Sequence, residues 1–120
     1  MVYSICKSKV LKGQGLASKY LLPTLNLDVN CLPSDFKYGV YSCRVFIANY
    51  SYLGMMHYGP RSTDSNISLE VHVIDTLLDE GITYVEFQPL KFVREVKFFE
   101  SLHDLKKQLG LDLINVVNND

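Results

Sequence analysis

Three short segments carry side chains of the types that bind or transfer phosphate groups. The first contains Gly13, Gly15, Ser18 and Lys19. Glycines let the backbone come close to a ligand and point consecutive N–H groups at an anion, and lysine adds a compact positive charge. These residue types suit phosphate binding. The segment has neither a P-loop pattern nor a dinucleotide-binding pattern, so on its own it is more typical of an ordinary turn.

The second segment, Pro23-Thr24-Leu25-Asn26-Leu27, alternates polar and apolar residues. In a strand this alternation places Thr24 and Asn26 on one face. A hydroxyl oxygen and an amide oxygen together suit Mg²⁺, which takes few protein ligands and completes its coordination with water and phosphate. The pattern also fits the polar outer face of an edge strand, and the segment alone leaves both interpretations open.

The third segment, Leu69-Glu70-Val71-His72-Val73-Ile74-Asp75, places Glu70 and His72 on one face of a strand. A carboxylate in such a position can accept the proton of a reacting hydroxyl group, which is the task of a general base. A histidine at this place more often makes structural hydrogen bonds. Glu70 is therefore the candidate base.

Most of the elements that must position these residues are strands. Alternating β-branched and aromatic residues predict strands over residues 2–11, 38–49, 52–58, 69–77 and 83–94. Residues 49–51 are the predicted turn of a hairpin. Pro89 predicts a bulge or an edge position in the last strand.

Helical spacing is confined to the C-terminal region. Leu102, Leu105 and Leu109 recur at three and four residues and predict a helix over about 100–110, ended by Gly110. Residues 115–120 are expected to fray. Many short strands followed by one helix indicate an all-β fold, a closed or nearly closed antiparallel barrel.

Composition limits the class of protein. The 120 residues are 48% hydrophobic and carry a net charge of −1, so we expect a single domain over 1–120 and no nucleic-acid partner. The chain has no apolar run long enough to span a bilayer and no signal peptide, so we expect a cytoplasmic protein with no membrane partner. Its three widely spaced cysteines are expected to be reduced and buried.

The order of these motifs resembles the riboflavin kinase (flavokinase) family. The resemblance covers most of the chain and rests on the following segments: Gly13 and Gly15, Pro23-Thr24-Leu25-Asn26, Gly39-Val40-Tyr41, Tyr52-Leu53-Gly54, Gly59-Pro60-Arg61, Glu70-Val71-His72, and Arg94 followed by Phe98-Phe99-Glu100-Ser101-Leu102. Each piece is short, but their order and spacing together are specific.

The resemblance implies a six-stranded antiparallel Greek-key barrel with a C-terminal helix. It also implies transfer of the ATP γ-phosphate to the 5′-hydroxyl of riboflavin, with Mg²⁺, to give FMN and ADP. By position, the implied roles are catalysis for Glu70; nucleotide binding for Gly13, Gly15, Ser18, Lys19 and Thr24; metal binding for Thr24 and Asn26; and flavin binding for Arg94, Phe99 and Ser101.

The chain departs from the family pattern before Pro23, where Tyr20-Leu21-Leu22 replaces the usual Leu-Gly-Phe, and at Ser62-Thr63, which replaces Pro-Thr. Two other functions therefore stay open. One is a catalytically weak or inactive flavin- or nucleotide-binding barrel that acts as a carrier or regulatory module, and the other is a small all-β interaction domain. For the kinase, the expected form is a monomer, working with an attached adenylyltransferase domain or a separate FAD synthetase.

Overall fold

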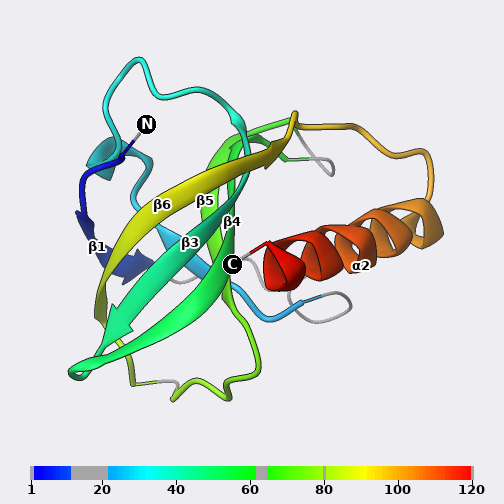
Figure 1. The fold of residues 1–120 in the computed structure, drawn as a ribbon. Coiled ribbons are helices and arrows are strands. Elements are labelled where there is room, and N and C mark those ends of the chain that lie inside the picture. The colour runs from blue at the N-terminus through cyan, green and yellow to red at the C-terminus, as the bar shows by residue number, and fades with distance from the viewer. Residues whose placement is uncertain (1, 12–21, 62–64, 80, 120) are drawn as a thin grey trace.

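A computed structural model describes residues 2–11, 22–61, 65–79 and 81–119. In this part of the chain six strands close into a barrel, and one α-helix follows them (Figure 1). The elements are β1 (Cys6–Leu11), β2 (Leu25–Leu27), the 3-10 helix η1 (Val29–Cys31), β3 (Gly39–Ile47), β4 (Tyr50–Pro60), β5 (Ile67–Val73), β6 (Tyr84–Arg94) and α2 (Leu102–Asn118).

Every neighbouring pair of strands in the barrel is antiparallel, in the order β1-β2-β5-β4-β3-β6. Strands β3, β4 and β5 follow one another as neighbours, and β6 returns to lie beside β3. This arrangement, with the fourth strand beside the first, is a Greek key. The predicted fold class is confirmed.

The hairpin between β3 and β4 turns one residue earlier than the sequence predicts. Ile47 pairs with Tyr50, so the loop consists of Ala48 and Asn49 alone. Both have positive φ, 48° and 71°, as in the type I′ turns that match the twist of a two-residue hairpin. Asparagine tolerates this conformation well, whereas Tyr50 begins the next strand.

Pro89 lies at a bulge, as predicted. Ser42 pairs with Lys91 and Cys43 pairs with Pro89, so Leu90 is an extra residue in β6. The Ser42 hydroxyl accepts a hydrogen bond of 3.1 Å from the Lys91 backbone N–H, which anchors the chain where the strand ladder is interrupted. The strand has neighbours on both sides, β3 and β1, so it is not an edge.

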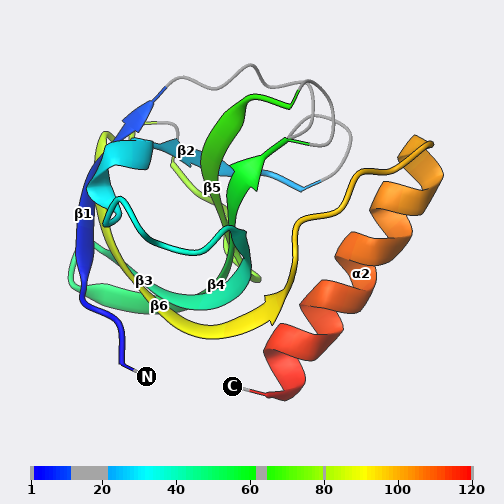
Figure 2. The same cartoon turned by 90° about the horizontal axis from the view of Figure 1, so that it is seen from above.

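Apolar side chains form two separate clusters. The larger fills the barrel and includes Tyr41, Met56, Val71 and Phe87, all almost fully buried. The smaller lies outside the barrel and joins Val40 and Met55 to α2. Figure 2 shows α2 lying beside the barrel, connected to β6 by an extended segment. Most of the candidate site residues described below lie in the region between them.

The predicted helix over 100–110 is wrong at its C-terminal end. Helix α2 continues through Gly110 to Asn118, and residues 115–118 belong to it. The apolar spacing continues past the glycine, because Leu113 and Val116 pack in the cluster with Val40. Burial of this stripe outweighs the roughly 1 kcal/mol that a glycine costs inside a helix.

Cys43 is fully buried, whereas Cys6 and Cys31 are partly buried, and all three are free thiols. Burial raises the pKa of Cys31 to about 11, with a smaller contribution from Cys6. Among the described residues, no helix is both long and apolar enough to cross a membrane.

Candidate active site

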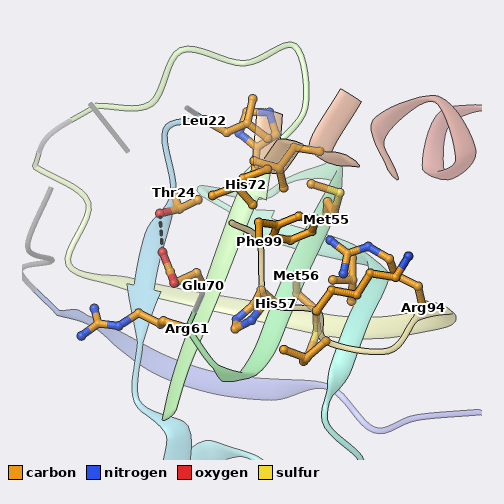
Figure 3. Close-up of a pocket in the computed structure, with 15 residues that line it drawn as sticks. Leu22, Thr24, Met55, Met56, His57, Arg61, Glu70, His72, Arg94 and Phe99 are labelled. Carbon is orange, nitrogen blue, oxygen red and sulfur yellow. Dashed lines mark hydrogen bonds between the residues drawn. The ribbon is translucent and has the colours of Figure 1, made fainter. Parts of the chain in front are cut away.

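Strand register lines up the predicted polar residues across the outer face of the barrel. Asn26 pairs with Glu70, and Glu70 pairs with His57. His57 in turn pairs with Val40, and Val40 with Arg94. One row therefore runs over β2, β5, β4, β3 and β6, and neighbouring members are about 5 Å apart. Most of these side chains border a pocket between the barrel and α2 (Figure 3).

Glu70 is held in this pocket by two hydroxyl groups. The Thr24 hydroxyl donates to Oε1 at 3.2 Å, and the Ser68 hydroxyl donates to Oε2 at 2.9 Å. Thr24 lies 46 residues away in the sequence, directly before β2, and the bond is drawn in Figure 3. The carboxylate thus has a fixed orientation while part of its surface stays accessible, as a proton acceptor for a bound hydroxyl requires.

His72 has the structural role that histidines in strands commonly take. Its Nδ1 lies 2.8 Å from the Pro23 carbonyl oxygen, and because a carbonyl can only accept, Nδ1 is the donor. The bond ties β5 to the residue that precedes Thr24. It therefore helps to fix the Thr24 hydroxyl beside Glu70.

Apolar side chains form much of the pocket wall. They come from the segment before β2, from the barrel, from the segment between β6 and α2, and from α2; they are Leu22, Val40, Met55, Met56, Val96, Phe99, Leu105 and Leu109. The polar side chains lie mostly on the barrel, and Lys97 adds one from the segment between β6 and α2. An apolar pocket with a few convergent polar groups is the usual form of a small-molecule site.

Arg94, predicted to bind flavin, lines this pocket and is also bound to α2. Its Nε and terminal nitrogen donate to the carboxylate of Asp112, and the shortest of these bonds is 2.7 Å. Another terminal nitrogen donates to the Glu95 carbonyl at 2.9 Å. The guanidinium lies 6.0 Å from the ring centroid of Phe99, which is within the outer range for a cation–π contact.

Ser101, the third predicted flavin residue, is the N-cap of α2. Its hydroxyl oxygen accepts a 3.1 Å hydrogen bond from the Asp104 backbone N–H. It is exposed and lies outside the set of pocket-lining residues, unlike Arg94 and Phe99. The cap fixes where the helix starts, and so where the preceding segment with Phe99 meets the pocket.

The residues of this region that were not predicted from the sequence include His57 and Asp112. His57 lies between Val40 and Glu70, and its buried Nδ1 has no hydrogen-bond partner among the described residues. Burial lowers the pKa of His57, against opposing effects that include the charge of Glu70. Alternation along β4 gives His57 the outward position, and the acidic Asp112 stands within the apolar stripe of α2; both signals were present in the sequence.

The predicted nucleotide residues Gly13, Gly15, Ser18 and Lys19 lie outside the described residues. Of the predicted metal ligands, Thr24 borders the pocket and Asn26 is the cross-strand neighbour of Glu70. Within the described part of the chain, no three His, Cys, Asp or Glu side chains form a metal-binding group. Neutral oxygens beside one carboxylate fit Mg²⁺, a hard cation that keeps several waters and phosphate oxygens.

A family model described as riboflavin kinase (flavokinase) matches residues 2–119. The chain belongs to the riboflavin kinase family. The match spans the barrel and α2 together, so the pocket between them lies within the family domain.

Two curated relatives of this riboflavin kinase domain are longer proteins, each with one segment that matches it. The RNA-binding riboflavin kinase RibR of Bacillus subtilis is 31% identical over 113 residues, 92% of this chain and 48% of the relative. The bifunctional riboflavin kinase/FMN adenylyltransferase of Buchnera aphidicola is 30% identical over 122 residues, 96% of this chain and 38% of the relative. The chain spans less than half the length of both.

A solved structure confirms the fold of the riboflavin kinase domain. It is the crystal structure of a protein described as a macrolide-efflux protein from Streptococcus pneumoniae, and it superposes with a TM-score of 0.75 at 26% identity. The similarity covers 95% of this chain and 38% of that one. The six-stranded closed barrel with its C-terminal helix is therefore shared by both proteins.

Proposed function

We propose that this domain is a riboflavin kinase that transfers the γ-phosphate of ATP to the 5′-hydroxyl of riboflavin. Family membership supports this reaction, and one observation carries it. Glu70 lies in the pocket with both carboxylate oxygens bound by hydroxyl groups, and Asn26 is its direct cross-strand neighbour. The site thus places a candidate proton acceptor beside candidate metal and phosphate ligands.

In this proposal Glu70 accepts the proton of the riboflavin 5′-hydroxyl. The hydroxyl oxygen forms a bond to the γ-phosphorus as the bond from that phosphorus to the bridging β–γ oxygen breaks, and ADP leaves with the bridging oxygen. Thr24 and Ser68 keep the carboxylate facing the substrate. Phosphoryl transfer depends mainly on such positioning and on stabilising the charge of the phosphate oxygens.

Thr24 and Asn26 are the proposed Mg²⁺ ligands. When bound, Mg²⁺ neutralises charge on the phosphate oxygens and helps to orient them. Thr24 also belongs to the proposed nucleotide site, with Gly13, Gly15, Ser18 and Lys19. Backbone N–H groups of the glycine-containing segment would donate to the phosphates of ATP.

The flavin is proposed to bind at the other end of the pocket, where Arg94 and Phe99 line the wall. Apolar neighbours such as Met55 and Leu109 suit an aromatic ring system and exclude water from the reacting groups. The Ser101 oxygen accepts a hydrogen bond from the helix, but its O–H is still a donor that a flavin could use.

A coupled assay with purified protein, riboflavin, ATP and Mg²⁺ tests the kinase directly, with FMN measured by chromatography. The proposal expects FMN formation that depends on all three components. Flavin binding without product at high protein concentration would instead support the carrier or regulatory module. Absence of both flavin-fluorescence quenching and ligand-induced thermal stabilisation would favour an interaction domain without these ligands.

The same proposal treats the domain as a monomer that supplies FMN to an adenylyltransferase, attached or separate. The bifunctional relative supports that pairing by its name. The relative named as RNA-binding is about twice as long as this chain, because the match takes up 48% of it. The net charge of −1 argues against a surface of this domain that binds the phosphate backbone of RNA. Electrophoretic mobility of labelled RNA with this domain alone tests the point, and no shift is expected.

A further inference from the structure

Helix α2 is tied to the barrel by a buried ion pair at the wall of the pocket. Arg94, the last residue of β6, contacts Asp112 in the middle of α2. The exposed fractions of the two side chains are 13% and 2%. Arg94 presents its Nε and one terminal nitrogen side by side to the two carboxylate oxygens, at 2.9 and 2.7 Å. Bidentate pairs of this kind fix the plane of the guanidinium group.

Asp112 has a further partner on its own helix. Gln108, one turn earlier, donates to Asp112 Oδ1 at 3.0 Å. The carboxylate therefore accepts from Arg94 and from Gln108, and its orientation is set from two sides. Buried ion pairs add little stability over apolar pairs of similar volume, so stability alone is a weak reason for one at this place.

The position of the pair relates it to the flavin end of the site. Arg94 lies in the same cross-strand row as Glu70, three strands away, whereas Asn26 is the neighbour of Glu70 on its other side. The distance along the row from Arg94 to Glu70 is roughly 14 Å, given a strand spacing of about 4.8 Å. A substitution at Arg94 should therefore affect riboflavin binding more than ATP binding.

We propose that Asp112 is a positioning residue for flavin binding: with Gln108 it holds the Arg94 guanidinium beside Phe99 and sets the distance of α2 from the barrel at the flavin end of the pocket. This inference rests on the proposed kinase function. It adds two residues that act through Arg94: Asp112 binds the guanidinium, and Gln108 binds Asp112. Asp112 acts through Arg94, so its removal has no further effect once Arg94 is gone.

A double-mutant cycle tests this relation, with the variants Asp112→Asn, Arg94→Met and the combination of both. We expect Asp112→Asn to raise the KM for riboflavin at least fivefold and to change the KM for ATP less than twofold. Arg94→Met should raise the riboflavin KM as well. In the double variant the riboflavin KM should match that of Arg94→Met, because coupled residues are non-additive.

Asp104→Asn is the matched control, because it removes an exposed carboxylate from the same helix. It should leave both KM values unchanged. Riboflavin affinity from fluorescence quenching, measured below the melting temperature of each variant, provides a second readout that needs no turnover. Asp112→Asn alone leaves the buried charge of Arg94 without its partner, whereas the double variant lacks both charges of the pair. The double variant can therefore still be compared with Arg94→Met if Asp112→Asn alone folds poorly.

Additive effects of the two substitutions overturn the positioning role, and so does an equal rise of both KM values or no change in either. Failure of the kinase proposal appears elsewhere, in the unaltered protein. An unaltered protein that binds riboflavin without making FMN contradicts the kinase but still allows the quenching cycle to test Asp112. An unaltered protein that binds no riboflavin overturns both proposals.

Discussion

Glu70 is the residue at which the proposed chemistry takes place, so its substitution gives the most direct test. Glu70→Gln keeps the shape of the side chain and removes its ability to accept a proton. We expect turnover to fall about 10²- to 10⁴-fold, roughly 3 to 5 kcal/mol of barrier, with nucleotide binding retained. FMN formation at saturating substrates measures the loss. Glu86→Gln, on β6 outside the pocket, is the control and should keep its turnover. If Glu70→Gln itself kept its turnover within a few-fold of the parent, Glu70 would be removed from the mechanism.

Asn26 provides a test of the metal and nucleotide end of the row. Asn26→Ala removes an amide oxygen beside Glu70, and we expect it to raise the Mg²⁺ and ATP concentrations needed for half-maximal rate more than the riboflavin KM. Titrations of each component at saturating levels of the others measure the three values. Asn30→Ala, at an exposed position of η1, should leave all of them unchanged. Equal weakening for flavin and nucleotide contradicts the assignment.

At this scale the sequence could indicate which residues share a face but not what contacts them. Alternation correctly placed Glu70 and His72 together, and the structure adds the hydroxyls of Thr24 and Ser68 on the carboxylate. Such partners depend on the register between strands that are distant in the sequence, and the alternation of residues within one strand does not determine that register. The place of Asp112 in the apolar stripe of α2 marks it as unusual, but its partner Arg94 lies on a different element, and only the structure pairs the two.

Among the elements, the long strands β3 and β6 were predicted better than the helix, whereas β1 begins at Cys6 rather than at residue 2 and β5 ends at Val73 rather than at residue 77. Alternation is a strong signal over strands as long as β3 and β6, whereas their ends shifted by a residue or more at turns such as Ala48–Asn49. The helix was predicted too short because Gly110 was interpreted as a C-terminal stop. Its actual end depends on packing against Val40 and Met55, which local spacing cannot reveal.

This correction leads to a prediction at Gly110. The residue is exposed inside α2, and a Cβ built on it would meet nothing within 4 Å. Gly110→Ala should therefore stabilise the protein by about 0.5 to 1 kcal/mol, because alanine loses less backbone entropy in a helix. The melting temperature should rise by about 2 to 5 °C. An unchanged or lower melting temperature would contradict a continuous helix at this position.

The molecule as a whole is built around two apolar clusters, and the pocket depends on both. One closes the barrel, and the other holds α2 against its outer face through Val40, Met55 and Val116. The sequence indicated a barrel and a helix, but not which face of the barrel the helix covers. That arrangement follows from apolar residues on the outside of β3 and β4, which in isolation look like ordinary breaks in the alternation. Only the packed molecule identifies Leu105 and Leu109 as pocket-lining residues.

His57 links this packing to pH. Burial lowers its pKa in the folded protein, so below the ordinary value of about 6.5 the unfolded chain binds the proton more readily. The stability that His57 contributes is therefore complete above about pH 6.5 and is lost as the pH falls from there toward the pKa of the folded protein. Each unit of difference between the folded and unfolded pKa values corresponds to about 1.4 kcal/mol of unfolding free energy. Glu70 opposes the lowering of the His57 pKa and Arg94 reinforces it. Between pH 7.5 and 5.5 the melting temperature of the unaltered protein should therefore fall further than that of His57→Gln, and equal falls would show that this histidine does not control acid stability.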